Sequence, residues 1–104
     1  MDMLEERQGG EISLLDMRHV TILADYFVIC TGTSERQLKT LADSLSRELK
    51  EEVGRPIHVE GDGESGWILL DYTDVVVHLF LPDVRSFYAL EELWKDAQTL
   101  VHIQ

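Results

Sequence analysis

Two short stretches of this 104-residue chain are apolar on both of the faces that a β-strand presents. The first, residues 26–31, is a continuous run of side chains that favour β-structure. In the second, both alternating sets are apolar apart from one histidine: Val75, Val77, Leu79 and Leu81 on one face, and Val76, His78 and Phe80 on the other. Strands of this kind are typical of a sheet that is covered on both sides. The chain is therefore expected to build its core around such a sheet.

Helix and turn signals place further elements in the first half of the chain. Residues 12–16 alternate as a strand, and Gly32 breaks the strand of residues 26–31. Ser34 and Gln37 have the spacing of a capping box, which predicts a helix that Gly54 and the following proline end. The apolar side chains with helical spacing are Leu38, Leu41, Ala42, Leu45 and Leu49.

The second half of the chain reads as three strands and a helix. Residues 57–60 and 67–70 are predicted strands, and residues 71–74 form the turn of a hairpin that leads into the strand of residues 75–81. Asp83 or Ser86 caps a last helix, which has Phe87, Leu90, Trp94 and Ala97 on one face. The unit of residues 26–60 is expected to be a right-handed crossover between parallel strands. The fold class is thus α/β or α+β, with a mixed sheet of about five strands and flanking helices.

The charge balance limits the choice of partner. There are 9 Lys and Arg residues against 20 Asp and Glu residues, which gives a net charge of −11. This argues against direct binding to the phosphate backbones of nucleic acids and favours a basic protein partner. No sequence-specific nucleic-acid partner is expected. The single cysteine excludes an internal disulfide framework, and no apolar run is long enough for a membrane helix. The acidic N-terminus resembles neither a signal peptide nor a transit peptide.

The predicted elements raise the question of what covers the sheet. Five strands span roughly 24 Å and a helix covers about 10 Å, so the two long helices suffice for one face. The second face would then be covered by the N-terminal segment, by a second copy of the chain or by another protein. Alternatively, the helices divide between the two faces.

Several residues have a functional and a structural interpretation. Cys30 lies within an apolar strand, where cysteine usually behaves as a small hydrophobe, and His78 fits a core or interface histidine better than a catalytic base. The alternating His58, Glu60 and Asp62 are a weak hint of a metal site, as are Asp71 and Asp74. Residues 32–34 lie where phosphates bind in many α/β proteins, but they lack the glycines and lysine of a phosphate loop. No metal site and no cofactor is predicted.

An aromatic and charged cluster late in the chain favours protein binding. It comprises Trp67, Tyr72, Arg85, Tyr88 and Trp94, and these are the residue types most enriched at binding hot spots. The structural interpretation places Trp67 and Trp94 in the core instead.

The same segments resemble a known family, the ribosomal silencing factors, also called the Iojap family. The resemblance rests on residues 24–34, 59–61, Trp67, 71–78 and 85–94, and it covers residues 11–95. A single domain over residues 1–104 is expected, with a residual N-terminal helix and turn in residues 1–10, the family core in residues 11–95 and a C-terminal tail in residues 96–104. Family members usually begin with a longer amphipathic helix than this chain has.

The resemblance implies a function. Family members bind the large ribosomal subunit through ribosomal protein L-fourteen, block its joining to the small subunit and thereby repress translation in the cytoplasm. Members often form homodimers, and their fold is similar to a reduced nucleotidyltransferase domain. The expected contact residues are Glu60, Gly61, Trp67, Asp71, Tyr72, Asp74, His78, Arg85 and Tyr88. No catalytic carboxylate set can be assembled, so we expect no enzymatic activity; the alternative is a small nucleotidyl- or phosphoryl-transferring enzyme that uses residues 32–34 with Asp71 and Asp74.

Overall fold

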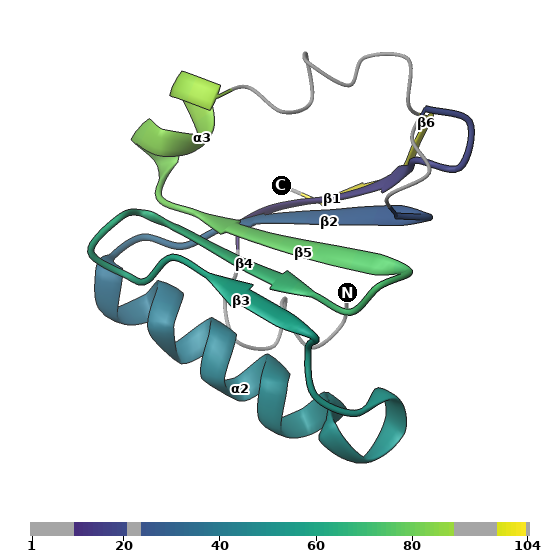
Figure 1. The fold of residues 1–104 in the computed structure, drawn as a ribbon. Helices are drawn as coiled ribbons and strands as arrows, with labels where there is room; N and C mark the ends of the chain where they lie inside the picture. Colours follow the sequence, from purple (N-terminus) through teal and green to yellow (C-terminus); the bar gives the residue numbers. More distant parts are fainter. Residues whose placement is uncertain (1–9, 21–23, 89–97, 104) are drawn as a thin grey trace.

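The computed structural model describes residues 10–20, 24–88 and 98–103. In chain order the elements are β1 (Gly10–Asp16), β2 (Tyr26–Thr31), α2 (Glu35–Val53), β3 (His58–Glu60), β4 (Trp67–Asp71), β5 (Val75–Phe80), α3 (Pro82–Tyr88) and β6 (Gln98–Ile103). The strands form one sheet in the order β3-β4-β5-β2-β1-β6, with α2 and α3 on opposite sides of it (Figure 1). The predicted mixed sheet with flanking helices is confirmed.

The two doubly apolar stretches form the centre of the sheet. β2 pairs with β5 in parallel, from Tyr26 opposite Val75 to Thr31 opposite Phe80. Every other pairing is antiparallel, including the predicted hairpin of β4 and β5. The strand after α2 does run parallel to β2, but it lies at the edge of the sheet with β4 and β5 between them. β3 suits an edge position because all three of its residues are exposed.

Helix α2 begins as its sequence predicts. The Ser34 hydroxyl accepts a hydrogen bond from the Gln37 backbone N–H (3.1 Å). The Gln37 side chain in turn accepts from the backbone N–H of Thr33 (2.6 Å), one residue before the cap. These bonds satisfy amide groups that a helix start leaves without partners. At the other end, the Gly54 N–H donates to the Lys50 carbonyl (3.1 Å), with Gly54 at a φ of 84°.

One apolar cluster fills the space between α2 and the sheet. Its buried residues are Ile12, Val28, Cys30, Leu38, Leu41, Ala42, Leu45, Ile68, Leu70, Val77 and Leu79. The predicted apolar stripe of the helix therefore lies in the core, apart from the partly buried Leu49 that packs against it. We estimate a contribution of about 2 kcal/mol for burying each large aliphatic side chain.

A second cluster lies on the opposite face of the sheet. Its buried members are Leu15, Met17, Ile29 and Phe80, with the partly buried Val20, Phe27, Trp67 and Val84 against them. Val84 belongs to α3, so the two helices divide between the faces and do not share one. The arrangement with both helices on one face is wrong, because the side chains of β5 and β2 are apolar on both sides and need cover on both.

Residues 98–103, expected as part of a tail, form the edge strand β6. It pairs with β1, from Ile12 opposite Ile103 to Asp16 opposite Gln98, with a register shift between Leu14 and Leu15. The sheet therefore has six strands, one more than expected. The helix expected in residues 1–7 and the continuation of the last helix through residues 89–97 lie outside the described residues. No helix within the described part of the chain combines the length and the apolar character needed to cross a membrane.

Candidate partner-binding face

The hairpin of β4 and β5 directs a row of side chains away from α2. Trp67 pairs with Phe80 and Leu69 pairs with His78 across the two strands. Residues that are paired across strands share a face, and Phe80 belongs to the cluster opposite α2. Trp67, Leu69 and His78 therefore lie on that face together, and we call this set the aromatic face.

A hydrogen bond joins the two polar rings of the aromatic face. The indole Nε1–H of Trp67 donates to Nδ1 of His78 (3.2 Å). Phe27 meets the imidazole edge-on with ring centroids 4.7 Å apart, and Phe80 stacks on it at 6.0 Å. Because Nδ1 accepts, the neutral imidazole carries its proton on Nε2. Nε2 is buried and has no hydrogen-bond partner among the described residues.

His78 gives the stability of the fold a pH dependence. Burial lowers the pKa of His78 to about 4 from its ordinary value of 6.5, because the charged imidazolium is poorly solvated there. Between these two values the unfolded chain binds more protons than the native protein. The free energy of unfolding should therefore fall as the pH falls from 6.5 to 4, by about 3 kcal/mol in all.

Urea unfolding at several pH values between 7 and 4 measures this effect, with His78→Gln as the comparison. The glutamine variant keeps all the carboxylates, so the difference between the two pH profiles isolates the imidazole. Parallel profiles for the two proteins would contradict the assignment.

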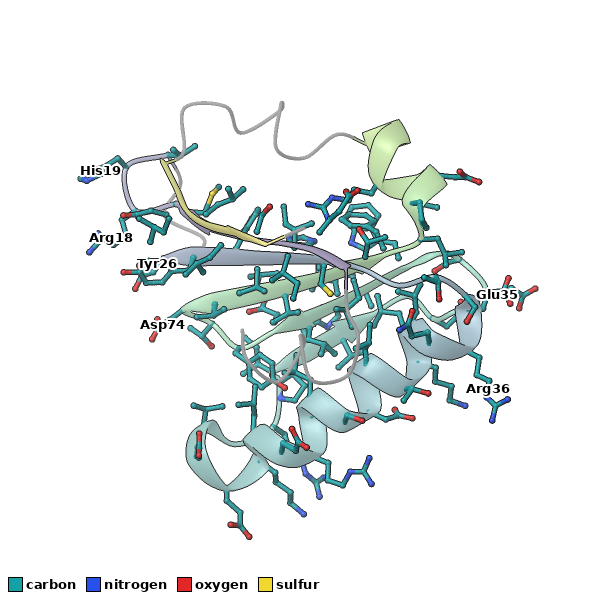
Figure 2. The ribbon with its side chains drawn as sticks, turned by 180° about the vertical axis from the view of Figure 1, so that it is seen from behind. Arg18, His19, Tyr26, Glu35, Arg36 and Asp74 are labelled. Carbon is teal, nitrogen blue, oxygen red and sulfur yellow. The ribbon has the colours of Figure 1, made fainter. Side chains whose placement is uncertain are left out.

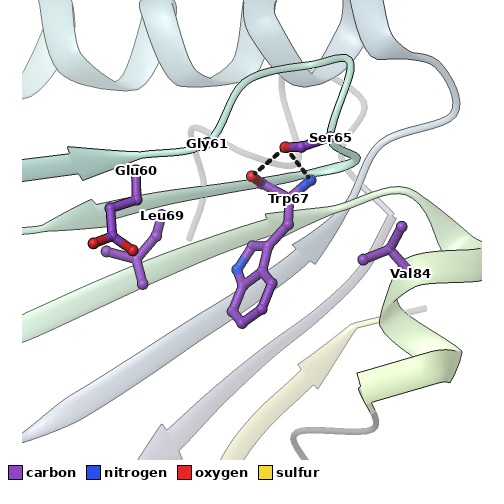
Figure 3. Close-up of a pocket in the computed structure, with 6 residues that line it drawn as sticks. All are labelled: Glu60, Gly61, Ser65, Trp67, Leu69 and Val84. Atoms are coloured by element: carbon purple, nitrogen blue, oxygen red, sulfur yellow. Dashed lines mark hydrogen bonds between the residues drawn. The ribbon is translucent and has the colours of Figure 1, made fainter.

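Beside Trp67 the surface forms a small pocket. Its volume is about 260 Å³, and it is lined by Glu60, Gly61, Ser65, Trp67, Leu69 and Val84 (Figure 3). The Ser65 hydroxyl holds the backbone of the loop beside the pocket. Its oxygen lies 2.8 Å from the carbonyl oxygen of Asp62 and 3.1 Å from that of Trp67. The Asp62 carboxylate accepts from the Ser65 N–H at 2.8 Å. The pocket thus has apolar walls, one carboxylate and a rigid loop behind the indole.

The structure separates the predicted site residues into two groups. Glu60, Gly61, Trp67 and His78 lie together on or beside the aromatic face, and Asp71 lies farther along the same strand as Trp67. The Asp71 carboxylate accepts from the Thr73 N–H (2.8 Å) and so also stabilises the hairpin turn, where Thr73 has a φ of 77°.

Tyr72 and Asp74 lie at another surface. They line a hollow of about 430 Å³ with Leu49 and Val53 of α2. The Tyr72 hydroxyl is buried and has no partner among the described residues, while the Asp74 carbonyl accepts from the N–H groups of Asp25 (2.8 Å) and Tyr26 (3.0 Å). The sequence cluster is therefore not one continuous patch. The Tyr88 side chain lies outside the described part.

Arg85 is buried beneath α3 and points into the protein. Its guanidinium donates to the Thr31 hydroxyl (2.7 Å), to the Ser13 hydroxyl (3.4 Å) and to the carbonyl oxygen of Glu11. The Glu11 carboxylate lies 4.0 Å away. Arg85 thus ties α3 to β1 and β2, and any influence on a partner is exerted through the position of this helix.

Sequence reasoning did not single out Leu69, Ser65 and Val84, which complete the pocket. Leu69 could have been found, because it alternates with Trp67 along the predicted strand and must share its face. Nothing local in the sequence identifies Ser65 or Val84, since each reaches the pocket only through the folded loop or the placement of α3.

The structure also bears on the other candidate sites. The side chains of Ser34 and Gln37 accept from two backbone N–H groups at the start of α2, those of Gln37 and Thr33. A Cβ on Gly32 would lie 2.8 Å from Leu38 Cδ2, so this segment is packed as a helix cap. Burial raises the pKa of the Cys30 thiol to about 11, which keeps it protonated and weakly nucleophilic. His58 Nε2 lies 2.7 Å from Glu60 Oε1, but no group of three or more metal-ligating side chains occurs among the described residues.

Three comparisons place the chain among known proteins. A ribosomal silencing factor RsfS of Bacillus subtilis is 40% identical over 93 residues, which are 89% of this chain and 79% of the relative. A crystal structure of a Chromobacterium violaceum protein superposes with a TM-score of 0.85 at 40% identity and covers 90% of this chain and 78% of that one. A mouse protein named for mitochondrial assembly of the ribosomal large subunit is 31% identical and matches 90% of this chain but 42% of its own length.

The family described as "Ribosomal silencing factor during starvation" matches residues 1–104, the full length of the sequence. The relatives at 40% identity agree with this match over 89% and 90% of the chain. The chain therefore belongs to the RsfS family of ribosomal silencing factors.

Proposed function

We propose that this protein represses translation by binding the large ribosomal subunit through ribosomal protein L-fourteen and blocking its association with the small subunit. Membership of the silencing-factor family supports the regulatory role, and the name of the mouse relative supports the large subunit as the partner. The mechanism is steric: the bound factor occupies the space that the small subunit needs. No chemical step is required of the protein, and it works in the cytoplasm, where the two subunits meet.

The aromatic face with its pocket is the observation that supports this proposal most. Trp67 is part-exposed, has its ring fixed by His78 and borders a pocket with a carboxylate at the rim. Rigid aromatic anchors beside a pocket are typical of binding hot spots. A net charge of −11 complements a basic ribosomal protein and accelerates encounter with it.

The contact residues divide by their placement. Glu60, Gly61, Trp67 and Asp71 meet the partner directly, and His78 and Arg85 hold the face in position. Tyr88 is also a proposed contact residue, while Tyr72 and Asp74, which lie at the surface over α2, are proposed for a second contact or for the homodimer. Homodimer formation is also part of the proposal.

Replacement of Trp67 tests the proposed face. Trp67→Ala should weaken binding to purified large subunits by about 2 kcal/mol or more, roughly thirtyfold, because a central anchor is lost. Trp67→Phe keeps a ring in the same place and should lose less affinity. Co-sedimentation measures the binding, and recombination of the two subunits measures the silencing.

Leu100→Ala provides a matched control, because Leu100 is an exposed apolar residue on β6 at the opposite edge of the sheet. It should bind and silence like the unmodified protein. Folded Trp67 variants with unchanged affinity would place the contact elsewhere. A nucleotide- and Mg²⁺-dependent rise in melting temperature would favour the transferase alternative.

A further inference from the structure

The pocket beside Trp67 is built from an acidic part of the chain. All six of its lining residues come from residues 56–84, a stretch that contains no lysine or arginine. The six carboxylates of this stretch belong to Glu60, Asp62, Glu64, Asp71, Asp74 and Asp83. A cationic group that approaches the pocket therefore meets a negative potential.

The cations of the described part of the chain lie elsewhere. Most of them belong to α2, which packs against the other face of the sheet, and Arg36 among them projects away from the sheet (Figure 2). Arg55 lines a hollow beside α2, and Arg18 is paired with a carboxylate at 2.7 Å. Arg85 points into the protein. The protein's own described cations therefore do not neutralise the pocket.

Glu60 is the one charged group among the described residues that line the pocket. It pairs with Leu69 across β3 and β4, so its side chain lies on the same side of the sheet as the aromatic face. Its Oε1 lies 2.7 Å from Nε2 of His58, and no described lysine or arginine lies within 4.0 Å of its carboxylate. His58 thus orients the carboxylate, and Oε2 remains able to accept from a cationic donor.

The walls of the pocket are apolar at the end away from this carboxylate. Figure 3 shows the indole of Trp67 between Glu60 and Val84. The indole is held in place, because its Nε1–H donates to Nδ1 of His78 (3.2 Å) and its ring lies against Phe80 with centroids 4.9 Å apart. An occupant that fills the pocket therefore crosses the indole with an apolar segment and ends at the carboxylate.

A long side chain with a cationic head fits this arrangement. The pocket volume of about 260 Å³ is smaller than the roughly 300–1,000 Å³ of sites for drug-sized ligands, and it suits a single side chain. Lysine and arginine lay their methylene stems along apolar surface and keep the charge at a polar edge. A guanidinium also donates two parallel hydrogen bonds to a carboxylate and lies against aromatic rings, which an ammonium group does less well. An indole beside a carboxylate therefore favours arginine.

We propose that this pocket receives one arginine side chain of the protein partner, with the guanidinium on the Glu60 carboxylate and the stem across the indole of Trp67. The inference rests on the proposed function in that the ribosomal partner supplies the arginine. It makes Glu60 a determinant of specificity. A partner with a neutral or acidic side chain at this place would cover the carboxylate without giving it a counter-ion, and such a partner is rejected.

Titration of the isolated full chain with N-acetyl-arginine amide tests the pocket without any ribosome. The indole N–H signal of Trp67 in the NMR spectrum, assigned with Trp67→Phe, reports the binding. N-acetyl-citrulline amide has the same shape without the charge, and the arginine compound should bind at least about threefold more tightly. Glu60→Gln should remove this preference. Glu64→Gln removes an exposed carboxylate that does not line the pocket and should keep the preference within about twofold.

The same two variants test the role of the pocket in partner binding. Glu60→Gln should weaken co-sedimentation with purified large subunits by about tenfold, because the partner's guanidinium loses its counter-ion inside the contact. Glu64→Gln lowers the net charge equally and should change the affinity less than about twofold. Glu60 lies on an exposed edge strand, so both variants are expected to fold like the unmodified protein.

Equal binding of the arginine and citrulline compounds would overturn the proposal, as would a preference that persists in Glu60→Gln. Equal binding of N-acetyl-lysine amide would overturn the assignment to arginine. Unchanged capture of large subunits by Glu60→Gln would overturn the role of the pocket in the contact. Failure of the unmodified protein to bind large subunits would contradict the proposed function instead, since the arginine preference is measured on the isolated chain.

Discussion

Replacing Arg85 by leucine is expected to lower the free energy of unfolding by about 3 kcal/mol. Arg85 is 6% exposed, and its guanidinium donates to the hydroxyls of Thr31 and Ser13 and to the Glu11 carbonyl. Leucine fills part of the space but removes the guanidinium donor from the buried Thr31 and Ser13 hydroxyls. Urea unfolding measures the loss, and α3 should lose its fixed position on the sheet.

Two further variants show whether the loss comes from the buried hydrogen bonds. Arg85→Lys keeps the charge but cannot bridge acceptors on two strands, so it should recover only part of the stability. Arg18→Leu removes a cation that is 54% exposed from a carboxylate, Asp16, that is 7% exposed and keeps the Arg18 backbone N–H as a donor (3.0 Å), and it should cost about 1 kcal/mol. Similar losses for Arg18→Leu and Arg85→Leu would show that Arg85 has no special structural role.

Alanine at Gly61 is expected to destabilise the protein by about 3 kcal/mol or more. Gly61 has a φ of 80°, which alone disfavours a side chain, and an added Cβ would lie 1.9 Å from the carbonyl oxygen of Trp67. That oxygen is backbone at the start of β4, so the strand itself must move. The same displacement shifts the indole, and large-subunit binding should weaken together with stability.

Gly54→Ala is the matched control for the steric part of this effect. Gly54 has a similar φ of 84°, but nothing lies within 4 Å of an added Cβ. It should cost about 1–3 kcal/mol without any clash, because Gly54 combines its positive φ with a ψ of −165°, a conformation that is essentially confined to glycine. The difference between the two variants measures the clash with β4, and equal destabilisation would contradict it.

The local elements of the fold were predictable because their signals are local. The cap of α2 at Ser34, the hairpin turn of residues 71–74 and the doubly apolar β2 and β5 follow from short patterns. The place of β3 at the edge and the presence of β6 were not predictable, since strand order depends on pairings between distant segments. The division of the helices between two faces was among the alternatives, but periodicity does not choose between them.

The residues of the candidate site were likewise predictable by type, but their positions and contacts depend on the tertiary structure. Trp67 and His78 were identified from residue type, yet their hydrogen bond depends on the register of β4 and β5. Arginine is a residue type that is enriched at interfaces, which is why Arg85 was predicted as a contact. Only the placement of α3 shows that it points toward Ser13 and Thr31. Tyr72 and Asp74 follow Asp71 within three residues but line a hollow with α2.

The pairing of β1 with β6 has a consequence for how the molecule is made. These strands lie at opposite ends of the described chain, and the central pair β2–β5 also joins segments far apart in sequence. Such high contact order slows folding, because long loops must close before the pairings can form. During synthesis the sheet cannot close until β5 has been translated and cannot gain its last strand until β6 has left the exit tunnel. The described sheet is therefore completed last at its β1 edge, after all of its other strands have been made.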